Sequence, residues 1–110
     1  MRSIITRYDN MCLICNSPYV ERHHLLGGTS KRQLADVDGV FCGLCPKHHN
    51  SSKMSVHQNK EMKVLSQALA QACWQRQYLA NKLAENSGSA DDYISESAEA
   101  FKARYGEYFL

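Results

Sequence analysis

Residues Phe41–Asn59 read FCGLCPKHHNSSKMSVHQN and hold two cysteines and three histidines in nineteen positions. Such residues are dense in only one other place, upstream, where the sequence CLIC begins at Cys12 and is followed by His23 and His24. Nine of the ten Cys and His residues of the chain lie between positions 12 and 57. Thiolates and imidazoles are the ligands that borderline-soft divalent ions prefer. We therefore interpret the rest of the chain as a frame for metal chemistry.

The length and the charge distribution narrow the class of protein. A chain of 110 residues predicts a single domain, small enough to benefit from a bound metal. Residues 1–60 hold eight Lys/Arg against four Asp/Glu, a balance of +4, whereas residues 61–110 hold five against seven, a balance of −2. All five histidines lie in the basic half. This asymmetry favours an anionic partner at the Cys/His end.

The N-terminal sequence MRSIITRYDNM lacks the apolar run of a signal peptide, and no stretch has the length and hydropathy of a membrane span. We therefore expect no membrane association and a cytoplasmic location. Thiols stay reduced in that compartment, so paired cysteines indicate metal ligands rather than disulfides.

The first half of the chain predicts two short strands. β-Branched, aromatic and apolar residues favour a strand over Tyr19–Leu26, which ends at Gly27. In a strand His23 and His24 point to opposite faces, so we expect different roles for them. The other elements expected here are an irregular lead or short strand over residues 1–11, a knuckle turn over Cys12–Pro18, a loop over Thr29–Asp38 with one helical turn near Arg32–Ala35, and a second strand over Gly39–Leu44.

The second half predicts helices. Pro46 suits a first helical position, and a long helix is expected from about Val56. Its apolar stripe, with Cys73 as a core residue, recurs at three- and four-residue spacing over Met62, Leu65, Leu69, Cys73, Arg76, Leu79 and Leu83. The sequence Asn86-Ser87-Gly88 is expected to end this helix. A last helix over Asp91–Tyr105 is expected to be capped by Ser89 and stopped by Gly106.

Two cysteines three residues apart, Cys12 and Cys15, predict half of a structural zinc site, which takes four tetrahedral ligands. Two spacings about thirty residues later can complete it. Cys42 with Cys45 would give four thiolates, whereas Cys45 with His48 would give three thiolates and one imidazole. Both pairs have the spacing of a zinc knuckle.

If His48 is a zinc ligand, four histidines remain, namely His23, His24, His49 and His57. Three neutral imidazoles with an open coordination position would make a catalytic metal site. The fourth histidine, with an ordinary pKa of about 6.5, could take a proton from water near neutral pH.

The order of these residues resembles the HNH endonuclease family, which has a ββα-metal fold. The segments RHHLLGG, LCPKHHN and VHQN are similar to those of short HNH-like proteins of phages and prophages, as is the final FKARYGEYFL. The main resemblance covers roughly residues 10–60. It implies an α+β protein with a small, zinc-stapled, treble-clef-like core over 10–60. A helical extension over 61–110, with a long helix and a short C-terminal helix, would follow.

The resemblance also implies site residues. His23 stands where the family has a metal ligand, and His24 stands where it has the general base. His49 and His57 match the two metal-binding histidines of the family's helix, although they are eight residues apart rather than four, a gap that the segment Asn50–Ser55 would absorb.

The family's final zinc ligand directly precedes the first metal-binding histidine of its helix. The resemblance therefore favours Cys45 with His48, and leaves Cys42 as a small buried strand residue that alternates with Leu44. The place of the family's middle Asn, which steadies the base, is held by Val40. The candidates to replace that Asn are Asp36, Asp38 and Asn59.

The function that the resemblance implies is hydrolysis of DNA phosphodiester bonds by an endonuclease of a bacterial host or phage. It would use the structural zinc and one catalytic divalent ion, Mg²⁺, Mn²⁺, Ni²⁺ or Zn²⁺. Basic residues suited to flanking phosphates are Arg22, Lys31, Arg32, Lys47 and Lys53. The rival hypothesis is a non-catalytic zinc-knuckle module of phage origin that binds nucleic acid or protein. A third has the helical half as an oligomerisation arm.

Overall fold

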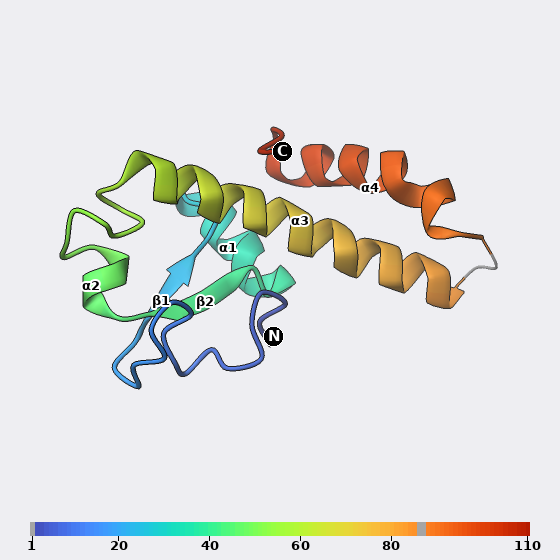
Figure 1. Ribbon diagram of the computed structural model, residues 1–110. Helices are drawn as coiled ribbons and strands as arrows, with labels where there is room; N and C mark the ends of the chain where they lie inside the picture. Colours follow the sequence, from blue (N-terminus) through green and yellow to red (C-terminus); the bar gives the residue numbers. More distant parts are fainter. Residues whose placement is uncertain (1, 86–87) are drawn as a thin grey trace.

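The computed structural model describes residues 2–85 and 88–110. It has the expected α+β composition, with a two-stranded sheet and four helices among these residues. The elements are β1 (Glu21–His24), α1 (Thr29–Asp38), β2 (Phe41–Leu44), α2 (Pro46–His49), α3 (Lys60–Glu85) and α4 (Ala90–Tyr105). In Figure 1, α3 runs along the molecule with α4 beside it, and the sheet and the N-terminal segment lie on the other side of α3. None of the helices in the described ranges combines the length and hydropathy needed to cross a membrane.

The two strands are antiparallel and pair His23 with Cys42 and His24 with Phe41. The N-terminal segment, which is irregular as expected, crosses β2 at Gly43, whose carbonyl accepts a hydrogen bond from the Leu13 N–H at 2.9 Å. A Cβ at position 43 would lie 2.5 Å from the carbonyl oxygen of Asp9. Only glycine lets the backbone approach the strand so closely.

The segment Thr29–Asp38 is a ten-residue helix, so the expected loop with a single helical turn is wrong. Its inward residues follow a helical spacing that the polar composition conceals: Lys31, Leu34, Ala35 and Asp38 are the less exposed ones. The helix ends at Gly39, whose left-handed backbone (φ 80°) lets its N–H reach the carbonyl of Ala35.

The long helix begins at Lys60 rather than near Val56. The side-chain oxygen of Asn59 caps it by accepting a hydrogen bond from the Met62 N–H at 2.9 Å. Before Asn59 the chain folds back on α2, where the His57 N–H donates to the His49 carbonyl at 3.1 Å. This fold-back brings His57 next to His49, although the two histidines are eight residues apart in the sequence.

The expected apolar stripe does not describe the buried face of α3. Leu65 is 63% exposed, and Cys73 is only half-buried and lies outside the hydrophobic core. Leu69 and Leu83 are exposed as well. The buried positions are Ala70 and Gln71, because α4 and the C-terminal residues pack there. The side-chain oxygen of Gln71 accepts hydrogen bonds from the last two backbone N–H groups, at 2.6 and 3.0 Å.

The last helix agrees with the sequence. Ser89 caps it in a reciprocal capping box with Asp92, and Gly106 ends it with a left-handed backbone. Its inner face carries Phe101 and Tyr105, both buried. The predicted end of α3 at Asn86 and Ser87 lies outside the described residues.

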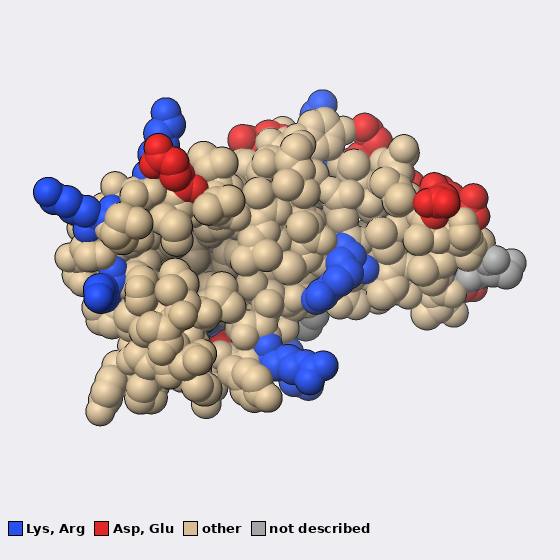
Figure 2. All heavy atoms as spheres, viewed as in Figure 1, with Lys and Arg blue, Asp and Glu red and all other residues tan. Residues whose placement is uncertain are grey.

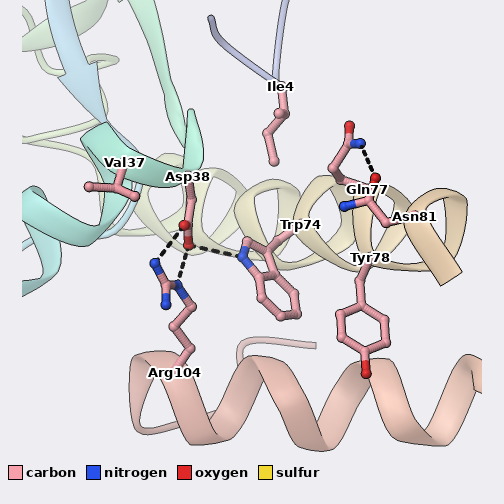
Figure 3. A pocket seen from close by; sticks show the side chains of 8 residues that line it. All are labelled: Ile4, Val37, Asp38, Trp74, Gln77, Tyr78, Asn81 and Arg104. Atoms are coloured by element: carbon pink, nitrogen blue, oxygen red, sulfur yellow. Dashed lines mark hydrogen bonds and ion pairs between the residues drawn. The ribbon is translucent and has the colours of Figure 1, made fainter. Parts of the chain in front are cut away.

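Asp38 ties α1 to the two long helices. Its carboxylate accepts hydrogen bonds from the Trp74 indole at 3.0 Å, from the Tyr105 hydroxyl at 2.7 Å and from the Arg104 guanidinium at 2.5 and 2.7 Å. Figure 3 shows the Trp74 and Arg104 contacts converging on this one side chain. Burial alone would raise the pKa of Asp38, but Arg104, Tyr105 and Trp74 outweigh it and lower the pKa. Asp38 is therefore a structural ion.

Candidate metal centre

Four side chains converge where the N-terminal segment meets α2, and we call Cys12, Cys15, Cys45 and His48 the closed cluster. Their ligand atoms all lie within 4.8 Å of one another. The sulfurs of Cys15 and Cys45 are 3.7 Å apart, and the Cys12 sulfur is 3.6 Å from His48 Nδ1. Ligands of one tetrahedral zinc, with Zn–S bonds of ~2.3 Å and Zn–N bonds of ~2.0 Å, lie roughly 3.5–3.8 Å apart. The closed cluster can therefore hold a structural metal such as zinc.

Local backbone geometry builds the closed cluster. Asn16 has a left-handed backbone (φ 64°), and its N–H donates to the Cys12 carbonyl at 2.8 Å, which closes the first turn. The Cys45 carbonyl accepts from the His48 N–H at 3.0 Å as the chain enters α2 behind Pro46.

The same backbone favours the ligating form of Cys12. Burial alone would raise the pKa of this thiol, but the N–H groups of Cys45, Cys15 and Ile14 outweigh it and lower the pKa to about 6. The thiolate, which is the form that binds metal, is thus favoured at neutral pH.

Cys42 stands apart from this cluster. It lies in β2 opposite His23, is 2% exposed, and belongs to the hydrophobic core. Burial, with the neighbouring Cys12 thiol, raises its pKa to about 12. Cys42 therefore remains a neutral thiol and a packing residue, and His48 rather than Cys42 lies with the other three side chains.

Three imidazoles form a second group, and we call His23, His49 and His57 the open cluster. They come from β1, from α2 and from the segment that folds back on α2. Their ring centroids are 4.6 to 5.3 Å apart, and Nε2 of His49 and Nε2 of His57 are separated by 3.0 Å. Two nitrogens on one tetrahedral ion lie roughly 3.3 Å apart, so the rings fit a shared ion. Three donors leave further coordination positions open.

Oxygen atoms outside the open cluster orient two of its rings. The Glu21 carboxylate lies 2.8 Å from His49 Nδ1, and an ionised carboxylate only accepts, so Nδ1 carries the proton and Nε2 can ligate. Similarly, the Ser66 hydroxyl of α3 contacts His23 Nε2 at 3.1 Å, which leaves His23 Nδ1 as the atom that can ligate a metal ion. Neither Glu21 nor Ser66 was singled out from the sequence, because nothing in their local pattern marks them.

Burial favours the neutral form of two rings in the open cluster, those of His23 and His57. It lowers the pKa of His23 to about 3, with smaller effects from the neighbouring histidines. The pKa of His57 is also lowered, first by burial and then by His49 and Lys63. A neutral ring is the form that binds a metal ion, so the donor set fits a divalent ion at neutral pH.

His24 points away from His23, as strand geometry predicts, and contacts Asp36 of α1. Its Nε2 lies 2.9 Å from the carboxylate oxygen Oδ1, which also accepts from Arg22 at 3.1 Å. His24, and to a smaller extent Arg22, lowers the pKa of Asp36. The proton of His24 is therefore on Nε2, and Nδ1 has a free lone pair.

Of the three residues considered as replacements for the family's Asn, only Asp36 contacts His24 among the described residues. Asp38 is occupied by α3 and α4, and the Asn59 side chain caps α3.

The open cluster and His24 line one pocket of about 290 Å³. Its other lining residues are Arg22, Gly27, Gly28 and Arg32. Two of the five expected phosphate contacts, Arg22 and Arg32, thus lie at this pocket. Lys63, which the sequence analysis missed, lines an adjoining hollow with His23, His24 and His57.

The other three expected phosphate contacts lie elsewhere. Lys31 pairs with Glu107 at 3.4 Å. Lys47 and Lys53 are exposed and are absent from the described lining of this pocket.

Comparisons with protein-family models, with curated proteins and with solved structures find no match for this chain.

Proposed function

We propose that this protein is a metal-dependent endonuclease of the HNH type that hydrolyses DNA phosphodiester bonds. One observation carries the proposal: three imidazoles with ligand atoms within 4.8 Å of one another lie in the same pocket as a fourth histidine held by a carboxylate. Open metal positions beside a positioned base are what hydrolysis of an unreactive ester requires.

The roles follow from the contacts. A divalent ion held by His23, His49 and His57 would neutralise charge on the scissile phosphate and on the leaving oxygen. His24 takes a proton from the attacking water through Nδ1. Asp36 keeps the proton on Nε2 and stabilises the positive ring that forms, so it does for this base what an orienting carboxylate does in other hydrolases.

The pocket also suits a polyanionic substrate. Among the described residues its lining includes Arg22 and Arg32 but neither Asp nor Glu. Guanidinium groups bind phosphate oxygens in a sequence-independent and salt-dependent way. Within the same proposal, zinc in the closed cluster is structural: it fixes the N-terminal turn to α2 and so places His49 beside His57.

A plasmid-nicking assay tests this function. Metal-stripped protein, reloaded with one equivalent of zinc, is given supercoiled DNA and one divalent ion at a time. We expect nicking that depends on the second ion and falls about 10²- to 10⁴-fold in His24→Ala. The variant should keep the parent melting temperature, because His24 is not a ligand of either cluster. Nicking that needs no second ion, or that survives His24→Ala undiminished, contradicts the proposal.

A further inference from the structure

A second hollow lies away from the metal clusters, between the N-terminal segment and α3. It has a volume of about 790 Å³ and is lined by three arginines, Arg2, Arg7 and Arg76. Its other polar side chains are uncharged, namely Ser3, Thr6, Gln77 and Asn81. Figure 2 shows Lys and Arg side chains near one another over this part of the surface, whereas the visible Asp and Glu lie mostly over α4.

These arginines lack the carboxylate partners that other arginines of the chain have. Arg22 pairs with Asp36 and Arg104 pairs with Asp38, but within residues 2–85 and 88–110 none of the three makes an ion pair. Arg76 donates instead to the Ile4 carbonyl at 3.1 Å, which fixes its guanidinium at the edge of the hollow. Clustered guanidinium groups without carboxylates favour an anion, above all phosphate.

An aromatic pocket adjoins the arginine hollow and shares Ile4, Gln77 and Asn81 with it. Its volume of about 340 Å³ is at the lower end of the ~300–1,000 Å³ of ligand pockets. Figure 3 shows the Trp74 and Tyr78 side chains next to each other in it. Their ring centroids are 5.6 Å apart and their planes are 25° from parallel. Asp38 borders this pocket, but Arg104 neutralises it.

We infer that the two hollows together bind an unpaired stretch of nucleic acid. The arginines take consecutive phosphates, and one base enters the adjoining pocket against Trp74 and Tyr78. Basic grooves beside aromatic rings are how proteins hold single strands, since every base offers a face to stack while only the backbone is charged. A paired base is enclosed in its own stack and offers no such face.

This inference goes beyond the proposed hydrolysis because it concerns another surface. Ser66 contacts the open cluster, and Arg76 is ten residues further along α3, about 15 Å at ~1.5 Å per residue. Binding there needs neither the open cluster nor His24. It can therefore be measured without cleavage.

The chain has one tryptophan, so the fluorescence of Trp74 reports on the pocket directly. Zinc-loaded protein without other divalent ions is titrated with an oligothymidylate of about 12 nucleotides, within the known range of single-strand site sizes. We expect saturable quenching. Arg2→Gln with Arg7→Gln should weaken binding about tenfold and reduce the salt slope by about 1.4, at ~0.7 for each lost phosphate contact. Both side chains are exposed, so the variant should fold.

The matched control, Lys60→Gln with Lys102→Gln, removes the same charge from exposed positions of α3 and α4 outside both hollows and should bind like the parent. Equal weakening in the two double variants overturns the inference. So does binding that leaves Trp74 fluorescence unchanged, or equal quenching by a duplex of the same length. Quenching without plasmid nicking counts against the proposed hydrolysis alone, and nicking without quenching counts against this inference alone.

Discussion

The closed and open clusters are built from similar residue types, and two adjacent residues of one helix belong to different clusters. His48 belongs to the closed cluster and His49 to the open one, both on the four-residue helix α2. A zinc ion in the closed cluster would have four protein ligands, three of them from cysteine, so no position would be left for a substrate. In the open cluster the protein supplies three imidazoles beside a pocket that also holds His24. Under the proposed function, the number of protein ligands would distinguish the stabilising site from the reactive one.

The largest expected difference between the clusters is in stability. Cys12→Ser should lose the tightly bound zinc and most of the cooperative melting transition. Zinc binding in such sites is worth about 10–16 kcal/mol, which is comparable to the usual free energy of unfolding of a whole domain, ~5–15 kcal/mol. Cys42→Ala is the matched control, since Cys42 is buried but outside the cluster. It should keep the zinc with a modest loss of packing. Metal analysis and melting curves check both, and a Cys12→Ser protein as stable as the parent refutes the structural role.

Variants of the adjacent histidines His48 and His49 should differ in which metal ion they lose. His48→Ala should release the structural zinc. His49→Ala should keep this zinc and the parent melting temperature, but should lower the affinity for the second ion by more than about 100-fold. Titration calorimetry with the second ion measures this difference. Equal effects of the two variants would mean that the clusters are not independent.

A smaller loss of stability should distinguish Gly43, where the N-terminal segment crosses β2, from a glycine with free space around it. Gly43→Ala places a methyl group 2.5 Å from the Asp9 carbonyl, so the N-terminal segment must shift, at a cost of about 1–3 kcal/mol. Gly27→Ala meets no atom within 4 Å and should be neutral. Chemical denaturation of the zinc-loaded variants compares them. A Gly43→Ala protein as stable as the parent would show that the N-terminal segment does not pack closely against β2 at this position.

The smallest expected effect depends on pH and concerns the helical half. The pKa of Asp38 is lowered in the folded protein, so its ion contacts stabilise the fold above the ordinary pKa of 3.8 and are lost as the pH falls through the lower folded value. Asp38→Asn should therefore melt below the parent at pH 7, and the difference should shrink as the pH falls below 4. The zinc content at pH 7 should not change. A difference that stays constant with pH would exclude the ionic contribution.

The sequence predicts the parts of this structure that depend on local spacing. The strand alternation separates His23 from His24, and the serine and glycine at the ends of α4 mark its limits, as observed. The helix α1 was not predicted, because its inward face is built from Lys31 and Asp38 as well as Leu34, and such a face reads as polar.

Contacts between segments that are distant in the sequence could not be predicted from local spacing. The pairing of His24 with Asp36 depends on how α1 packs on β1, and Asp36, Asp38 and Asn59 were equal candidates from the sequence. The leucines of α3 predicted the wrong face because the bulky rings of Trp74, Phe101 and Tyr105, rather than the leucine stripe, fill the contact with α4. Tertiary packing of this kind overrides helix propensity and hydrophobic periodicity.

The most direct test of the two-cluster account is a cobalt titration of the metal-stripped protein, followed by visible and near-ultraviolet absorption. Three cysteine sulfurs lie in the closed cluster and none in the open one. The first equivalent should therefore produce the thiolate-to-cobalt band. The second should bind more weakly and add only the weak bands of a nitrogen-ligated ion. In His49→Ala the titration should stop at one equivalent. Saturation of the parent at one equivalent, a four-thiolate spectrum, or two equivalents bound by His49→Ala would contradict the account.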